Sequence, residues 1–518
     1  MTAHANAVDT HTGTGLAPTG GELVHQLLDD ALTEVPDHRA VTDARGSWTY
    51  RELADHSHRF SAWLRERGIG PGDRLVVQLP STRELTAMLY GASRSGVTFV
   101  PLNPAMKPFH LESVLANAEP ALVVVPGTVR AERASLTPAP VLDMETVWAR
   151  TVATDYAPAA GDDAAKVRPD DIAVLVYTSG STSAPKAVMC PHAQMTFASR
   201  SIQQVLDYRA DDVVFCRFPL SWDYGLYKVL LAALGRSEIV LAGEESDLVL
   251  VKRMRETGAT VVPIVPSLAA MIATLASRDT EPAPPVRLFT NTGAALPDAT
   301  ITALRENFPG VRVVRQFGQT ECKRISIMPP GMDGEKPGSV GLPLPGTEVR
   351  ILDPEGRALP AGETGEIIAA GPHVMPGYWC APELTDKAFR PDPVTGGLLL
   401  HTGDFGSLDE DGFLYFEGRR DDMFKRKGIR MSVLEIEGAA MAVPGVRAAA
   451  AVPPSDTHDL ALFVEADLAP QVVLRELTKL LEPQKVPGVC RVLKEFPLTL
   501  HGKNARQVLT EMLAGSHQ

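Results

Sequence analysis

The stretch RLVVQLPSTRELTAMLYGASRSGVTFVPL, residues 74–102, decides the fold class. Its apolar start has the length and composition of a buried strand. Residues Ser81 to Glu84 then have the pattern of a capping box, and apolar side chains recur at the i, i+3, i+4, i+7 spacing of a helix from Leu85 to Ala92. The run TFVPL predicts the next strand, so the whole stretch predicts a strand–helix–strand unit.

The pattern continues on both sides of this unit. The runs at 121–125 and 172–177 predict further buried strands of an α/β sheet, while residues 126–170, crowded with Pro, Ala, Asp and Gly, predict mostly irregular surface chain. From about residue 337, short apolar segments separated by Gly, Pro and Asp predict a smaller β-rich subdomain. After residue 420 short strands alternate with an amphipathic helix near 470–482, which predicts a second, α+β domain.

We therefore expect three segments. Residues 1–20 are predicted to be a disordered tail, residues 21–420 an N-terminal core of layered α/β subdomains plus the β-rich subdomain, and residues 421–518 a small C-terminal domain. The first twenty residues lack the apolar segment of a secretory signal, and no run approaches about 18 apolar residues. A cytoplasmic protein without membrane contact is the expectation.

Composition excludes several classes. With 44% hydrophobic and 22% charged residues, the 518-residue chain is unlike collagen, coiled coils and disordered proteins. Its net charge of −13 disfavours a nucleic-acid or anionic-membrane surface, so neither partner is predicted. The two closest of its five cysteines are 26 positions apart, which leaves no zinc-knuckle spacing and predicts reduced thiols.

One loop is dense in groups that bind phosphate. The string Tyr177-Thr-Ser-Gly-Ser-Thr-Ser-Ala-Pro-Lys186 combines five Ser or Thr hydroxyls, a glycine and a lysine. Such a loop offers hydroxyls, backbone N–H groups and an ammonium to an anion, as nucleotide phosphates require. It lacks the spacing of a Walker A loop, and by composition alone a polar surface turn fits about equally well.

Four further strings follow in order. They are Gln316-Phe-Gly-Gln-Thr-Glu321, Thr402-Gly-Asp404, Gly418-Arg-Arg-Asp-Asp-Met-Phe-Lys425-Arg-Lys-Gly428-Ile-Arg430 and Pro497-Leu-Thr-Leu-His-Gly-Lys503. With the 177–186 loop, they resemble the YTSGSTGxPKGV, YGxTE, TGD, GRxDxxxKxxGxR and PLTxxGK motifs of the adenylate-forming (ANL) superfamily. That superfamily includes acyl-CoA synthetases, stand-alone nonribosomal peptide adenylation enzymes and luciferases, and the resemblance covers residues 20–510.

The resemblance implies an ATP- and Mg²⁺-dependent ligase that adenylates a carboxylic acid and releases pyrophosphate. Glu321 is the implied magnesium ligand, Asp421 the implied hinge and Lys503 the mobile catalytic lysine, with Lys186 and Glu321 completing the implied catalytic set. The implied ATP-binding residues are Thr178, Ser179, Gly180, Ser181, Thr182, Lys186, Gln316, Phe317, Gly318, Thr320, Asp404, Arg419 and Lys503. Ser183 and Ala187 replace glycines of the family loop, which removes backbone freedom, but we expect activity to survive.

The acid-binding residues are carried over by motif position. Asp223 stands where amino-acid-activating members hold the substrate amine; alternatively it caps the following helix. The implied pocket comprises Trp222, Asp223, Tyr224, Tyr227, Ser267, Thr290, Thr292, Gly293, Gln316, Arg324 and Ile325. Its polarity favours a small amino, polar or aromatic acid over a long alkyl chain. Arg324 either pairs with a second carboxylate or other oxyanion, or points to solvent.

The acceptor is not encoded plainly. No phosphopantetheine-attachment string follows Lys503, which predicts a stand-alone ligase of secondary metabolism that transfers the acyl group to CoA or to the phosphopantetheine thiol of a separate carrier protein. The alternatives are an acyl- or aryl-CoA ligase for an amine-free acid, and an adenylating enzyme that activates an unusual oxyanion or uses an amine acceptor. A phosphotransferase would instead release ADP.

Overall fold

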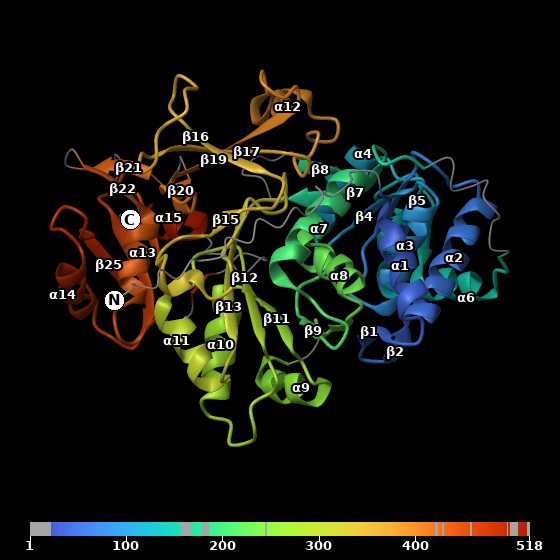
Figure 1. The fold of residues 1–518 in the computed structure, drawn as a ribbon, viewed down its shortest axis with the longest axis horizontal. Coiled ribbons are helices and arrows are strands. Elements are labelled where there is room, and N and C mark those ends of the chain that lie inside the picture. The colour runs from blue at the N-terminus through green and yellow to red at the C-terminus, as the bar shows by residue number, and fades with distance from the viewer. Residues whose placement is uncertain are drawn as a thin grey trace, which may run out of the picture.

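The computed structural model describes residues 22–156, 167–178, 186–243, 246–419, 423–426, 429–455, 458–494, 496–497 and 506–514. Its elements form a large α/β body, an antiparallel sheet above it and a smaller C-terminal lobe beside it (Figure 1). The mixed α/β class predicted from residues 74–102 is confirmed. No helix within the described residues is both long and apolar enough to cross a membrane.

The first large sheet has six strands in the order β6-β5-β3-β4-β7-β8. Its neighbours are parallel except at β7–β8. Apolar side chains from both faces of β3 are buried, which explains the continuous apolar runs in the sequence. The strands are β3 (Arg74–Val77), β4 (Thr98–Pro101), β5 (Leu122–Val125), β6 (Val141–Asp143), β7 (Ile172–Thr178) and β8 (Lys186–Pro191).

The predicted strand–helix–strand unit is present as β3, α3 (Arg83–Arg94) and β4. Its helix cap is one residue later than predicted: Thr82 accepts from the Leu85 N–H, while the Ser81 hydroxyl accepts from Leu220 N–H in a distant loop. The expectation of irregular chain over 126–170 was wrong. This region contains α5 (Arg130–Ala134), β6 and α6 (Met144–Ala153), because β6 gains its hydrogen bonds from β5, a pairing that local composition does not reveal.

The second large sheet has nine strands in the order β15-β14-β13-β12-β11-β9-β10-β1-β2. They are β1 (Arg39–Asp43), β2 (Gly46–Thr49), β9 (Val213–Cys216), β10 (Glu238–Leu241), β11 (Val261–Ile264), β12 (Leu288–Asn291), β13 (Arg312–Phe317), β14 (Ser326–Ile327) and β15 (Leu342–Pro343). Besides α3, α5 and α6, the body contains the helices α1 (Val24–Glu34), α2 (Tyr50–Glu66), α4 (Pro108–Ala118), α7 (His192–Leu206), α8 (Asp223–Gly235), α9 (Leu250–Thr257), α10 (Pro266–Ala276) and α11 (Asp298–Asn307). Helices α7 and α8 pack against each other, near the carboxyl ends of the central strands (Figure 1).

The predicted β-rich subdomain is an antiparallel sheet of five strands. It contains β16 (Glu348–Leu352), β17 (Gly365–Ala370), β18 (Phe389–Pro391), β19 (Leu398–Leu408) and β20 (Leu414–Arg419), with α12 (Pro382–Ala388) before β18. The ring centroids of Phe317 on β13 and Phe416 on β20 lie 4.8 Å apart. This contact joins the end of the central sheet to the antiparallel one.

The C-terminal lobe has apolar clusters of its own. Its elements are β21 (Met423–Arg426), β22 (Ile429–Ser432), α13 (Val433–Met441), β23 (Val446–Val452), β24 (Ala461–Ala466), α14 (Pro470–Leu480), β25 (Val489–Leu493) and α15 (Arg506–Ala514). Helix α14 confirms the predicted amphipathic helix. The tail 1–20 and the boundary at 420–421 lie outside the described residues, so both stay predictions.

Candidate active site

A buried carboxylate lies between two donors just after β13. Glu321 Oε1 accepts from Lys186 Nζ at 2.9 Å and from the Tyr378 hydroxyl at 2.6 Å. The Lys186 ammonium also lies 4.1 Å from the centroid of the Tyr378 ring. Burial raises the pKa of the Glu321 carboxyl, but the Lys186 charge and the Tyr378 hydroxyl outweigh it and hold the pKa below its ordinary value. Glu321 is therefore ionised at neutral pH.

The loop that carries Glu321 reverses the chain within a few residues. Ile325 N–H donates to Phe317 O at 2.8 Å, and β14 then pairs antiparallel to β13. A Cβ on Gly318 would lie 2.6 Å from both Lys323 O and Arg324 Cα, so only glycine fits there. Lys323 adopts the left-handed conformation, with φ of 66°. This turn brings Glu321 and the pair Lys323–Arg324 close together on one loop.

The segments of three other motifs lie around this loop. Gln319 Nε2 donates to Thr402 O at 3.4 Å, which brings the Thr402–Asp404 segment beside it. Asp404 on β19 is opposite Arg419 on β20, and Arg419 Nε donates to Asp404 Oδ1 at 3.0 Å. The structure thus brings the described parts of four sequence motifs to one region. Ser179, Gly180, Ser181, Thr182, Asp421 and Lys503 lie outside the described residues.

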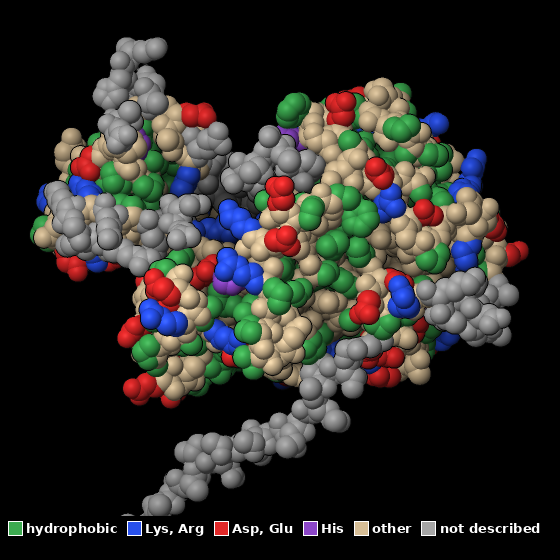
Figure 2. Space-filling view, turned by 90° about the horizontal axis from the view of Figure 1, so that it is seen from above, with side chains coloured by type: hydrophobic (Ala, Val, Ile, Leu, Met, Phe, Trp, Pro, Cys, Tyr) green, Lys and Arg blue, Asp and Glu red, His purple; other side chains and the backbone are tan. Residues whose placement is uncertain are grey.

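Positive side chains gather at this region. In the space-filling view, Lys and Arg side chains border the hollow between the smaller lobe and the body (Figure 2). The chain as a whole has a net charge of −13, so this concentration is local. A positive hollow attracts an anionic ligand such as a nucleotide.

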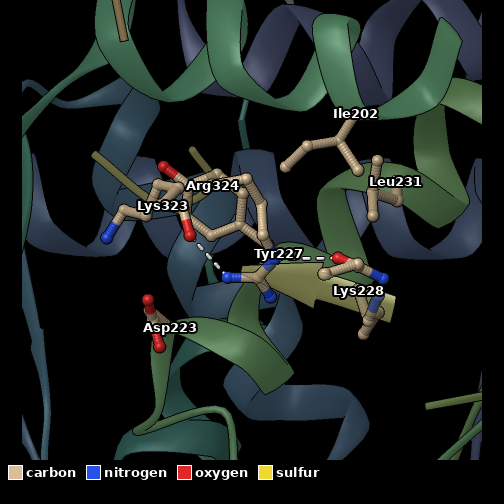
Figure 3. Close-up of a pocket in the computed structure, with 8 residues that line it drawn as sticks. Ile202, Asp223, Tyr227, Lys228, Leu231, Lys323 and Arg324 are labelled. Carbon is tan, nitrogen blue, oxygen red and sulfur yellow. Dashed lines mark hydrogen bonds between the residues drawn. The ribbon is translucent and has the colours of Figure 1, made fainter. Parts of the chain in front are cut away.

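A cavity adjoins the loop on the side of α8 (Figure 3). The empty space around its lining is about 240 Å³, which includes open solvent. Eight residues line it. Four belong to the predicted pocket, namely Asp223, Tyr227, Gln316 and Arg324. The other four are Ile202, Lys228, Leu231 and Lys323.

Asp223 is the first residue of α8, and the residue before it occupies the N-cap position. No hydrogen bond to the Asp223 carboxylate is found within the described residues. The alternative that this aspartate caps the helix is therefore wrong. Its charge lies near the positive end of the α8 dipole, which stabilises a carboxylate there.

Two cations from the reversing loop face the cavity. Arg324, 6% exposed, donates from Nε to Gln316 Oε1 at 2.8 Å, and its guanidinium lies 5.0 Å from the Tyr224 ring centroid. The alternative that Arg324 points to solvent is therefore wrong. Lys323 is 1% exposed; its ammonium lies 3.5 Å from Cys190 Sγ and 5.0 Å from the Tyr227 ring centroid.

A third cation, Lys228, comes from α8. It is 1% exposed, and its Nζ donates to the Tyr208 hydroxyl at 3.2 Å. Burial lowers the pKa of the Lys228 ammonium to about 7, and the nearby Arg324 charge adds to this. Sequence reasoning missed Lys228, although a lone lysine in the apolar stretch YGLYKVLLAALG was a signal that could have found it.

The other predicted pocket residues do not line this cavity. The Thr290 and Tyr224 hydroxyls lie 2.9 Å apart and hydrogen-bond to each other, while Ser267 is exposed on α10. The contact of these residues with the acid stays a prediction. They are Trp222, Tyr224, Ser267, Thr290, Thr292, Gly293 and Ile325.

The family described as AMP-binding enzyme matches residues 28–379. The chain belongs to this family. As an AMP-binding enzyme it is an adenylate-forming, ATP-binding protein of the ANL superfamily, as its five motifs predicted.

Individual relatives agree with this assignment. The chain is 55% identical to VinN, with a TM-score of 0.72, over 77% of this chain and 99% of VinN. VinN has also been solved with L-aspartate and with 3-methylaspartate. ATP-bound MatB from Rhodopseudomonas palustris is 26% identical, with a TM-score of 0.83, over 95% of this chain and 99% of MatB.

A curated relative is much longer than this chain. CymA of Salinispora arenicola (strain CNS-205), a probable nonribosomal peptide synthetase, is 32% identical over 511 residues. The match covers 95% of this chain but 6% of CymA. The similarity therefore concerns one segment of that protein.

Proposed function

We propose that this enzyme adenylates a small amino acid with a second carboxylate, such as aspartate, and transfers the acyl group to a thiol. The charge of the cavity carries the proposal: its lining has one carboxylate, Asp223, and three buried or nearly buried cations, Lys228, Lys323 and Arg324. The 55% identity to VinN, whose structures include complexes with L-aspartate and 3-methylaspartate, supports it.

Each charge of such a substrate has a partner in the cavity. The amine pairs with Asp223, and the second carboxylate pairs with Arg324 and Lys323. The reacting carboxylate then faces the nucleotide side, where Glu321 and Lys186 lie. An acid with one carboxylate would leave buried cations without a counter-charge, which is unfavourable.

On the nucleotide side, we assign the phosphates to Lys186 and the 178–182 hydroxyls, and the ribose to Asp404 with Arg419. Glu321 fits a magnesium ion, because it is an ionised carboxylate at the edge of the phosphate region. Magnesium typically takes one or two carboxylates, with waters and phosphate oxygens completing its shell. When bound, it would neutralise charge on the phosphates during attack of the acid on the α-phosphorus. Lys186 must leave Glu321 to reach those phosphates.

The remaining assignments rest on motif position. Lys503 is proposed as the mobile catalytic lysine and Asp421 as the hinge about which the C-terminal lobe turns. The acceptor is CoA or the phosphopantetheine thiol of a separate carrier protein, the latter favoured by the similarity to nonribosomal peptide synthetases. An acyl- or aryl-CoA ligase for an amine-free acid is the second candidate.

ATP–pyrophosphate exchange tests the proposal. The panel contains L-aspartate, L-alanine and β-alanine, which lack one or other carboxylate of aspartate, succinate, which lacks the amine, and 2-aminobenzoate and benzoate. We expect the strongest exchange with aspartate, and its loss in Asp223→Ala. Arg324→Ala should lower exchange with aspartate more than exchange with either monocarboxylic amino acid. Strong exchange with benzoate that survives Asp223→Ala would replace the proposal with the second candidate.

A further inference from the structure

Lys228 is the charged group of the cavity that no sequence motif explains. It lies on α8 five residues after Asp223, where the flanking side chains are apolar. Within the described residues its ammonium has one hydrogen-bond acceptor, the Tyr208 hydroxyl, although an ammonium carries three donors. A buried lysine whose role is only to fill space leaves this charge poorly compensated.

Lys228 and Arg324 share one aromatic ring. The Lys228 ammonium lies 4.6 Å and the Arg324 guanidinium 5.0 Å from the centroid of Tyr224. Both side chains also line the cavity; in the close-up Lys228 lies on the side away from Asp223, and the Arg324 guanidinium lies between the two (Figure 3). Lys228 is therefore the cation farther from the carboxylate that we assign to the amine, and Arg324 lies within reach of both.

The same cavity has donors without acceptors. Gln316 Nε2 and the Tyr227 hydroxyl are buried and have no hydrogen-bond partner among the described groups. Gln316 Oε1 is already occupied by Arg324 Nε. Unpaired buried donors beside Lys228 and Arg324 fit an oxygen-rich anion, since the two oxygens of a carboxylate can accept about four hydrogen bonds.

We propose that Lys228 is a specificity-determining residue that binds the second carboxylate of the substrate together with Arg324. This inference rests on the proposed function and goes beyond it, because it adds a residue of the α8 interior to those that select the acid.

Substitution by methionine isolates the charge. Lys228→Met keeps an unbranched side chain that ends where the ammonium begins, and Lys252→Met makes the same change on the exposed face of α9. We expect Lys228→Met to lower kcat/KM for aspartate in ATP–pyrophosphate exchange by about 10- to 100-fold, mainly through KM, the range for losing a hydrogen bond to a charged group. In the same variant, kcat/KM for whichever of L-alanine and β-alanine is the better substrate should change by less than about threefold. Lys252→Met should match the wild type for all three acids.

A second measurement needs only the wild-type protein. The groups facing Lys228 are Arg324, Tyr208, Tyr224 and Cys216. Burial raises the pKa of the Tyr208 hydroxyl and raises that of the Cys216 thiol to about 11, so these stay neutral at pH 8 while the guanidinium stays charged. Binding of a carboxylate should then protonate Lys228, with a net uptake of protons at pH 8. Calorimetry of aspartate binding in two buffers of different ionisation enthalpy measures this uptake.

The outcomes separate the two proposals. Selective loss of aspartate activity in Lys228→Met, or proton uptake by the wild type if that variant does not fold, supports the inference. If Lys228→Met folds and keeps the aspartate preference, or the wild type takes up no proton on binding aspartate, the inference is overturned while the proposed function stands. Wild-type exchange with monocarboxylic acids alone would overturn both.

Discussion

The Tyr378 hydroxyl is predicted to position the carboxylate that we assign to magnesium. It donates to Glu321 Oε1 at 2.6 Å, and the second donor to that oxygen is Lys186. Tyr378→Phe removes this one hydroxyl. The ring stays, and with it the contacts to Lys186 and to the Phe389 ring at 5.4 Å.

The expected magnitude follows from this geometry. A hydrogen bond to a charged group contributes about 1.5–3 kcal/mol, equivalent to roughly 10- to 100-fold in an equilibrium constant. Loss of a residue that orients a metal ligand lowers metal affinity by about the same factor. We therefore expect Tyr378→Phe to raise the Mg²⁺ concentration for half-maximal ATP–pyrophosphate exchange about tenfold or more, and to lower the thermal unfolding temperature of the ligand-free protein.

The stability difference should depend on pH in a defined direction. The folded-state pKa of Glu321 lies below its ordinary value, so its stabilising contribution is complete above the unfolded pKa of about 4.3 and is lost as pH falls through the folded value. Without the hydroxyl, the folded pKa rises. The gap in unfolding temperature between wild type and variant should therefore be largest near pH 7 and shrink below about pH 4.3. An unchanged Mg²⁺ requirement together with an unchanged unfolding temperature at pH 7 would refute the reasoning.

Three further predictions concern separate parts of the molecule. Gly318→Ala should destabilise the protein by about 1–3 kcal/mol and abolish ATP–pyrophosphate exchange with aspartate, because the new Cβ would overlap the backbone of the 323–324 turn. Gly334→Ala is the control in thermal unfolding, since its Cβ would meet nothing within 4 Å. Asp404→Asn should raise the KM for ATP about tenfold without changing that for the acid, and an equal rise in both would contradict its assignment to the ribose. Arg426→Met should destabilise the C-terminal lobe by about 1.5–3 kcal/mol, since the buried Arg426 donates to the half-exposed Asp459 and to two backbone carbonyls; faster hydrogen exchange over 429–494 with an unaffected 74–102 region checks this.

The sequence predicted those parts of the site that local motifs encode. The Lys186 loop follows β7 and Glu321 follows β13, two strands whose apolar runs are easily recognised, while Asp404 lies within β19 of the antiparallel sheet and was found from its Thr-Gly-Asp string alone. Tyr378 was missed because it meets Glu321 across 57 positions of chain, a contact that only the tertiary fold creates. Lys228 was missed for a different reason: its position in an apolar helix indicates burial but not which cavity the helix borders.

The fold of residues 74–102 was predicted because its strands and helix have strong hydrophobic periodicity over a short span. The elements of 126–170 were not, because β6 is three residues long and depends on pairing with β5. Local patterns fail where hydrogen bonds come from a distant strand.

The reversing loop after β13 limits how this enzyme could be re-engineered. Gln316 and Arg324 line the cavity that we assign to the acid, Glu321 is the carboxylate that we assign to magnesium, and Gly318 packs between them against the backbone of Lys323 and Arg324. Nine consecutive residues thus span both of the proposed sites. We expect a transplant of acid selectivity from a relative to need exchange of the segment 316–324 as one cassette, since the side chains that line the cavity and the carboxylate assigned to magnesium share one tightly packed turn.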